Sequence, residues 1–244
     1  MPMSYIFREH IKQSLAVIAF LITLTACTSE SYDAGDGPNS YLTADLVLLH
    51  TSQDKSVRSA LLDDGTTLQF SNPFAQDWLT RPDSVYRALL YYDKTVAASD
   101  AAASNPTATS IVRARSVRPV SVLRPVEAED METLRTDPVG FESIWLSKNK
   151  SYINLSLLLK SGKTEADDAL HTLGIVSHGT TTDADRRRTL HLTLYHDQGG
   201  VPAYYTVQQY VSIPTQLLEE ADTVELTLNT YNGKKVVKVA VSNL

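Results

Sequence analysis

The sequence predicts an all-β protein in which a small barrel is followed by a β-sandwich. From residue 41 onward, apolar and polar residues alternate with period two over short runs, which is typical of half-buried strands. Two hairpin signals, Asp64-Gly65 and Asn232-Gly233, lie between such runs. The 244 residues are 43% hydrophobic and include only ten glycines and ten prolines, so the chain has the composition of an ordinary globular protein.

The first β-rich region, residues 41–126, has the length and pattern of a small closed barrel of the OB type. Composition alone does not separate it from an SH3-like barrel. A two-residue turn at Asp64-Gly65 would place Leu61 opposite Leu68. Residues 95–110 have almost no bulky side chains, so we expect a flexible insertion there. The expected barrel strands cover residues 46–50, 56–62, 66–70, 85–94 and 111–126.

A short linker, residues 127–137, separates the barrel from the second region. Residues 127–136 are acidic and lack glycine and proline, which favours a connecting helix. Asp137-Pro138 then ends the helix, because a residue that precedes proline avoids the helical conformation. We therefore expect the second domain to cover residues 138–244.

This second region has longer strands and predicts an immunoglobulin-like β-sandwich. A two-residue turn at Asn232-Gly233 would pair Val224 with Val241 and Leu226 with Val239, so one face of the hairpin is apolar. The expected strands cover residues 141–148, 151–160, 172–178, 189–196, 203–212, 223–231 and 234–241.

The amino terminus reads as an export signal. Basic residues are followed by an apolar run at residues 15–24, which at about ten residues is too short to span a bilayer that needs roughly 20. The chain's single cysteine, Cys27, follows Leu24-Thr25-Ala26, and this sequence resembles a bacterial lipobox. We expect residues 1–26 to be removed as a lipoprotein signal peptide and Cys27 to carry the lipid.

Residues 27–40 are small, polar and acidic and predict a flexible tether. Thr28 is not aspartate, which by resemblance to enteric lipoproteins argues against retention at the inner membrane. We therefore expect an outer-membrane lipoprotein, held at the membrane by its lipid, on either the periplasmic face or the cell surface.

The remaining sequence has no pattern that specifies a reaction, a metal site or a cofactor. Glycine-rich phosphate loops, nucleophile elbows and paired-histidine metal motifs are missing from the sequence. His191 and His196 are five apart on one expected strand, so they project to opposite faces. The basic stretch 113–124 is outweighed by the net charge of −6, the export signal and the acidic residues after it, so we expect no nucleic-acid partner.

One candidate ligand or partner surface follows from a hairpin that we predict at Gln198–Val201. That turn would place Tyr195 opposite Tyr204 and Thr193 opposite Thr206 on one sheet face. The alternative is a set of tyrosines that only cover one side of a sheet. The predicted stripe consists of His191, Thr193, Tyr195, Tyr204, Thr206, Gln208 and Tyr210.

Several short motifs, in this order, resemble the NigD-like lipoproteins of Gram-negative bacteria over about residues 40–242. The resemblance implies an amino-terminal OB-type domain followed by a carboxy-terminal β-sandwich. It implies an association with bacteriocin genes and an immunity role, and it brings no catalytic residues. The motifs are Cys27, residues 62–66, 116–120, 137–139, 144–145, 152–155, 194–196, 212–214 and 229–233.

These observations favour a membrane-anchored, non-enzymatic binding protein, with a bacteriocin-immunity protein as one form of it. Its partner would be an envelope protein or a glycan, and the sequence leaves its oligomeric state open. One alternative is a structural or assembly lipoprotein of an outer-membrane complex. The other is an envelope hydrolase, which only His191, Tyr195 and His196 would support.

Overall fold

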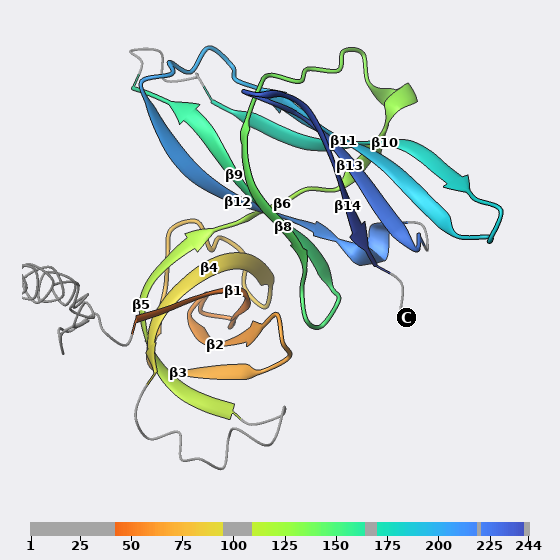
Figure 1. Cartoon of the computed structure of the whole chain (residues 1–244). Coiled ribbons are helices and arrows are strands. Elements are labelled where there is room, and N and C mark those ends of the chain that lie inside the picture. The colour runs from red at the N-terminus through yellow and green to blue at the C-terminus, as the bar shows by residue number, and fades with distance from the viewer. Residues whose placement is uncertain (1–41, 95–108, 164–169, 219–220, 242–244) are drawn as a thin grey trace, which may run out of the picture. The chain divides into compact units, whose positions relative to one another are not determined.

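The computed structural model describes residues 42–94, 109–163, 170–218 and 221–241 (Figure 1). These four ranges contain strands and short 3₁₀ segments but no α-helix, which confirms the all-β prediction. None of their helices has the length and apolar character needed to cross a membrane. The predicted signal peptide, Cys27, the tether and residues 95–108 of the predicted insertion lie outside the described residues.

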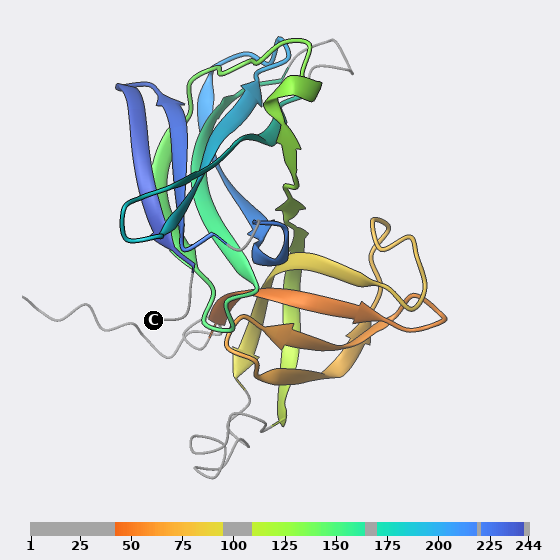
Figure 2. The ribbon, with the colours of Figure 1, turned by 90° about the vertical axis from the view of Figure 1, so that its right-hand side faces the viewer.

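Five strands close into a barrel in the order β1-β2-β3-β5-β4, which confirms the predicted small barrel (Figure 2). Val47, Leu49 and Leu90 are fully buried in its core. Strands β3 and β5 pair in parallel, and the other neighbouring strands pair antiparallel. The strands are β1 (Leu42–Thr51), β2 (Val57–Leu62), β3 (Thr67–Phe74), β4 (Val85–Lys94) and β5 (Thr109–Pro119).

The second region is a sandwich of two sheets, as predicted. The larger sheet has the order β14-β13-β11-β10-β7 and the smaller one β6-β12-β9-β8. Leucines of β11 and β9 and Ile213 of β12 are buried in one shared core between the sheets. The strands are β6 (Ser121–Val122), β7 (Pro125–Glu127), β8 (Gly140–Leu146), β9 (Tyr152–Ser161), β10 (Thr172–Thr182), β11 (Arg188–Asp197), β12 (Tyr205–Pro214), β13 (Thr223–Thr230) and β14 (Gly233–Ala240).

The sandwich begins earlier in the chain than residue 138. Strands β6 and β7, which the sequence assigned to the barrel, pair in parallel with β12 and β10 at the edges of the two sheets. The two strands have only two and three residues and are separated by Leu123 and Arg124. Neither is therefore long enough to show the alternation of apolar and polar residues by which a strand is predicted.

The predicted connecting helix over residues 127–136 is wrong. Only η2 (Ala128–Asp130) is helical, as a single 3₁₀ turn. The His196 backbone N–H donates to Arg135 O at 3.0 Å, and the Asp137 N–H donates to His196 O at 2.9 Å. These long-range bonds draw the end of the linker alongside β11, and a helix could not make them.

Both predicted turns form, but with different registers. The first is a three-residue loop in which the Leu62 N–H donates to Thr66 O, so Leu68 faces Ala60 rather than Leu61. In the second, Val224 pairs with Val239 rather than Val241. In both loops the glycine alone takes the left-handed conformation, with φ of 90° at the first and 101° at the second, as in a type I turn followed by a bulge.

Candidate binding cleft

The structure divides the predicted stripe between two sheets. Strand β11 pairs with β10 and β13, whereas β12 pairs with β9 and β6, so Gln198–Val201 links two sheets and is not a hairpin. The predicted pairing of Tyr195 with Tyr204 is therefore wrong. The physical reason is that the apolar faces of β11 and β12 pack against each other across the core, which requires the two strands to lie in opposite layers.

The β11 half of the stripe lies on the outer face of the five-stranded sheet. His191 Nδ1 lies 3.2 Å from Glu225 Oε1, and its Nε2 lies 2.8 Å from Thr181 Oγ1. Lys238 Nζ approaches Glu225 Oε2 at 3.0 Å, and its hydrogen bond is the main cause that lowers the pKa of Glu225. His196 is only 1% exposed on the opposite face, which confirms that the two histidines of β11 diverge.

The β12 half lies on the outer face of the four-stranded sheet, together with the preceding residue Tyr204, which is 78% exposed. Thr206 Oγ1 accepts a hydrogen bond from Lys160 Nζ at 3.1 Å. Gln208 donates to Ser156 Oγ at 3.0 Å. The Tyr210 ring meets Trp145 edge to face, with ring centroids 6.4 Å apart.

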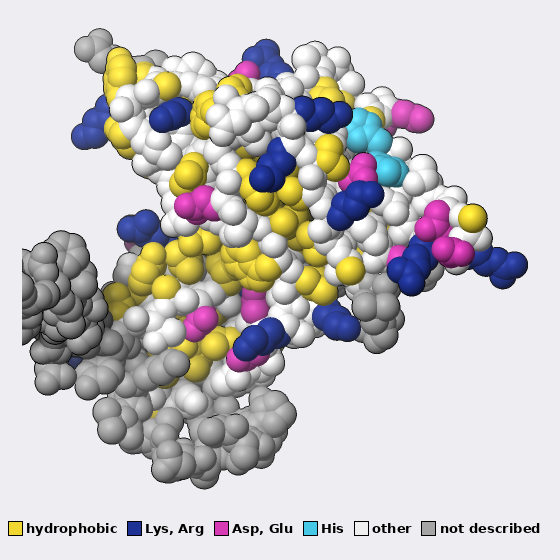
Figure 3. Space-filling view, in the orientation of Figure 1, with side chains coloured by type: hydrophobic (Ala, Val, Ile, Leu, Met, Phe, Trp, Pro, Cys, Tyr) yellow, Lys and Arg dark blue, Asp and Glu magenta, His cyan; other side chains and the backbone are white. Residues whose placement is uncertain are grey.

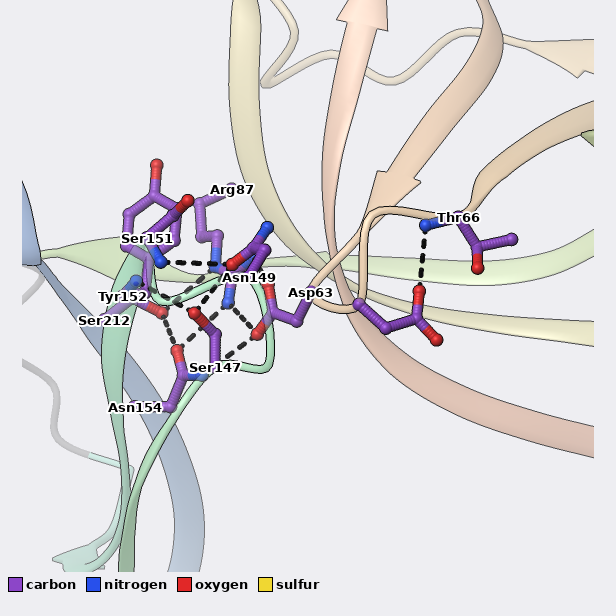
Figure 4. Close-up of polar contacts among 10 residues, drawn as sticks. Asp63, Thr66, Arg87, Ser147, Asn149, Ser151, Tyr152, Asn154 and Ser212 are labelled. Carbon is purple, nitrogen blue, oxygen red and sulfur yellow. Dashed lines mark hydrogen bonds and ion pairs between the residues drawn. The ribbon is translucent and has the colours of Figure 1, made fainter. Parts of the chain in front are cut away.

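Where this outer face meets the barrel, Arg87 of β4 is buried among partners from both regions (Figure 4). Its side chain is 1% exposed and donates to both carboxylate oxygens of Asp63, at 2.6 and 2.7 Å. It also donates to Asn154 Oδ1 at 3.0 Å and to Ser212 Oγ at 3.1 Å. The guanidinium carbon lies 4.4 Å from the centroid of the Tyr152 ring.

The partners of Arg87 also bind one another. Asn154 Nδ2 donates to Asp63 Oδ2 at 3.0 Å, and Ser212 Oγ donates to Asn154 Oδ1 at 2.7 Å. Because Asn154 and Ser212 are fully buried, each of these bonds satisfies a polar group that has no access to water. We call Asp63, Arg87, Asn154 and Ser212 the junction network.

Two local devices position this network. The three-residue turn leaves Asp63 outside the strand ladder, with its carboxylate aimed at the sandwich (Figure 4). The β8–β9 loop is organised by Asn149, whose side-chain oxygen accepts hydrogen bonds from the Ser147 hydroxyl and the Ser151 N–H. The Asn149 backbone N–H then donates to Asp63 O at 2.7 Å, so a loop of the sandwich also holds the turn of the barrel.

Next to the junction network is a cleft of about 360 Å³, within the range of small-molecule pockets. Hydrophobic side chains gather in a band where the barrel meets the sandwich (Figure 3). Aromatic side chains come from both sides of the cleft, and three carboxylates and one lysine accompany them. The lining residues are Ala44, Asp45, Leu46, Leu62, Asp63, Asp64, Leu89, Tyr91, Trp145, Leu146, Ser147, Lys148 and Tyr210.

Each of the three carboxylates of the cleft accepts hydrogen bonds that fix its position. Burial acts to raise the pKa of Asp64, but the hydrogen bonds from Thr66 and the charge of Lys148 outweigh it and lower that pKa. Asp45 accepts a hydrogen bond from the Tyr92 hydroxyl at 2.8 Å, and burial together with this carboxylate raises the pKa of Tyr92. The cleft therefore offers fixed anions and aromatic surface to a ligand.

The described ranges contain no group of three or more His, Cys, Asp or Glu side chains that could hold a metal ion. The three residues that suggested a hydrolase do not meet in one site. His191 and Tyr195 are on the outer face of the larger sheet, and the buried His196 Nε2 lies 2.9 Å from Nδ1 of His171.

Comparison with known proteins bears on the sandwich and on the whole fold. The model of the NigD-like C-terminal beta sandwich domain matches residues 122–241. None of the curated proteins compared with this chain matches it.

Solved structures from species of Bacteroides and Parabacteroides share the fold. A NigD-like immunity protein from Bacteroides caccae is 23% identical, with a TM-score of 0.59, over 81% of this chain and 91% of that one. A candidate toxin-related protein from Parabacteroides distasonis is 20% identical, with a TM-score of 0.53, over 81% of this chain and 92% of that one. A candidate lipoprotein from Bacteroides fragilis is 12% identical, with a TM-score of 0.58, over 83% and 99%. Residues 122–241 of this chain thus match the NigD-like C-terminal beta sandwich domain, the family that the sequence motifs resemble.

Proposed function

We propose that this protein is a non-enzymatic binding protein of the cell envelope that holds a polypeptide partner in the cleft beside the junction network. The observation that carries the proposal is the position of Trp145 and Tyr210. Both line the cleft, and Tyr210 continues into the polar stripe formed by Tyr204, Thr206 and Gln208 on the same sheet face.

A polypeptide fits this surface better than a small ligand. Tryptophan and tyrosine in a pocket are the residue types that most often dominate binding energy between proteins. A cleft of about 360 Å³ is large enough for one or two side chains of a partner, and the adjoining stripe offers hydrogen bonds to its surroundings. A protein partner is also supported by the shared fold, because one structure with this fold is described as a NigD-like immunity protein and another as a candidate toxin-related protein.

A binding role also agrees with the chemistry of the cleft. Asp63 is committed to Arg87, and the lowered pKa of Asp64 leaves it ionised rather than available as a general acid near neutral pH. Asp45 accepts a hydrogen bond from Tyr92. Asp64 and Asp45 are thus the carboxylates of the cleft that are suited to recognising a basic or hydrogen-bonding side chain of a partner.

The binding module would be tethered to the outer membrane by lipid on Cys27, on the periplasmic face or at the cell surface. The lipobox-like sequence supports this, and so does the fold shared with a candidate lipoprotein. Two or more acyl chains are needed for stable anchoring, since one chain alone binds a bilayer only weakly.

The test is crosslinking in intact cells, followed by affinity purification and mass spectrometry. We expect wild type to capture a defined envelope or secreted protein and Cys27→Ala to lose it where the partner is reached only at the membrane. Two cleft variants, Trp145→Leu and Asp64→Asn, should weaken capture of the partner while keeping the thermal unfolding temperature of wild type; Asn at position 64 removes the charge but keeps the oxygen that accepts the Thr66 N–H. Equal capture by both folded variants would contradict the proposed site, and binding to glycans alone would replace the polypeptide with a saccharide ligand.

A further inference from the structure

A second pocket, of about 260 Å³, lies at the β13–β14 turn, and no residue of the cleft lines it. One wall is the segment Val139–Phe141, and the other is residues 230–235. Its lining contains Lys234 and Lys235 and no carboxylate, in a chain whose net charge is −6.

Backbone hydrogen bonds hold the two walls together. The Val139 N–H donates to Asn229 O at 3.0 Å, and the Tyr231 N–H donates to Val139 O at 3.3 Å. Gly140 allows β8 to approach β9 closely, since a Cβ there would lie only 2.7 Å from Leu158 Cβ. The pocket is therefore part of the folded sandwich rather than a gap beside a loose turn.

An aromatic ring contacts one of the two lysines that line this pocket, and another ring contacts a lysine outside the lining. Lys235 Nζ lies 4.7 Å from the centroid of the Phe141 ring. Lys160 Nζ, close by, lies 5.8 Å from the centroid of the Tyr231 ring and donates to Thr206. A cation over a ring face keeps its charge and loses some of its rotamer freedom, so less entropy is lost when an anion binds.

These cations have no acidic partner. Among the described residues, no carboxylate forms an ion pair with Lys160, Lys234 or Lys235, whereas Lys238 on the same strand is paired with Glu225 at 3.0 Å. Unpaired lysines around a pocket create a local positive potential, and lysine binds phosphate groups as a point charge.

We propose that this pocket binds a phosphate group carried by an envelope molecule. The shared chemistry is a phosphate oxyanion bound by Lys235, which lies over Phe141 in the pocket, with the charge of Lys234 adding to the positive potential from the adjacent strand position. It has two sources, a phosphorylated sugar or a phospholipid headgroup. This pocket and the cleft share no lining residue, so the phosphate proposal and the proposed function can be tested and disproved separately.

The test uses residues 28–244 without the lipid, so that an anchor cannot itself insert into vesicles, and measures their binding to four probes by titration calorimetry and vesicle sedimentation. The soluble probes are glucosamine 6-phosphate and unmodified glucosamine, and the vesicles are made of phosphatidylglycerol or of phosphatidylcholine. We expect saturable binding to glucosamine 6-phosphate, to phosphatidylglycerol or to both, and none to the two probes without net negative charge. Binding only to the sugar phosphate or only to the vesicles identifies the source.

Matched variants on strand β14 complete the test. Lys235→Gln should weaken binding by about tenfold, Lys235→Arg should keep most of it, and Lys238→Gln should change it by less than about twofold. Both positions are exposed, so the fold should persist in all three variants, and thermal unfolding checks this. Equal binding by Lys235→Gln and wild type, or no saturable binding of wild type to either phosphate probe, would overturn the proposal.

Discussion

Arg87 and Asp63 form a bidentate ion pair, with N–O distances of 2.6 and 2.7 Å. The pair joins strand β4 to the β2–β3 turn under the edge of the sandwich. Arg87 has 1% of its side chain exposed and Asp63 has 19%. The pair is completed by Asn154 and Ser212 from two strands of the sandwich. It therefore couples the fold of the barrel to its contact with the second domain.

Removing one charge of this pair should destabilise the protein strongly. Asp63→Asn leaves the buried guanidinium without its counter-charge, and breaking a buried pair in this way costs about 3–5 kcal/mol. Urea unfolding measures the loss. The control is Asp54→Asn, which breaks the exposed Arg58–Asp54 pair and should leave the unfolding midpoint unchanged. A midpoint for Asp63→Asn close to that of the control would show that the junction network does not hold the fold together.

The glycine of the β2–β3 turn should resist substitution for a conformational reason alone. Gly65 has a φ of 90°, and a Cβ there would meet no atom within 4 Å, so Gly65→Ala brings backbone strain without a clash. We expect a loss of about 1–2 kcal/mol in the free energy of unfolding. Gly174→Ala is the control, because its Cβ would make an ordinary contact with Tyr195 at 3.5 Å and should cost far less. Equal losses at the two positions would argue against the left-handed turn.

Acidification should destabilise the sandwich through the histidine pair. Burial, together with the charge of His196, lowers the pKa of His171 below its usual 6.5. The unfolded state therefore binds a proton first, so stability is full above pH of about 6.5 and falls as the pH drops toward the folded-state pKa. Urea unfolding across this range measures the slope, and His171→Gln should reduce it. An unchanged slope in that variant would assign the acid sensitivity to other groups.

The sequence predicted the strands and the core because those features follow from local period. Leu190, Leu192 and Leu194 alternate with polar neighbours on β11, and all three are buried. The Asp-Gly and Asn-Gly turns were located correctly, but their registers were not. Both dipeptides suit a two-residue turn as well as a longer one that places only the glycine in the left-handed region.

Two features could not be predicted from the sequence: the division of the predicted stripe between two sheets, and the junction network. Both depend on pairing between residues far apart in the chain, which the local alternation of apolar and polar residues does not encode. Two glycines between β11 and β12 suit a hairpin, yet the chain crosses there from one sheet to the other. A signal for the network was present. Asn154 and Ser212 are polar residues within the largely apolar strands β9 and β12, and Arg87 lies in the same way within β4. Polar residues that are buried in this way need hydrogen-bonding partners. Their mutual pairing could not be predicted without the fold.

The most direct test of the proposed function places a photo-crosslinking amino acid at Tyr210 in living cells. Tyr195 is the matched control, because it is also a partly exposed tyrosine of the predicted stripe but lies on the other sheet. We predict that the probe at position 210 captures a discrete protein partner and that the probe at position 195 does not. Capture of the same partner from both positions, or from position 195 alone, would contradict a binding cleft at the barrel–sandwich junction.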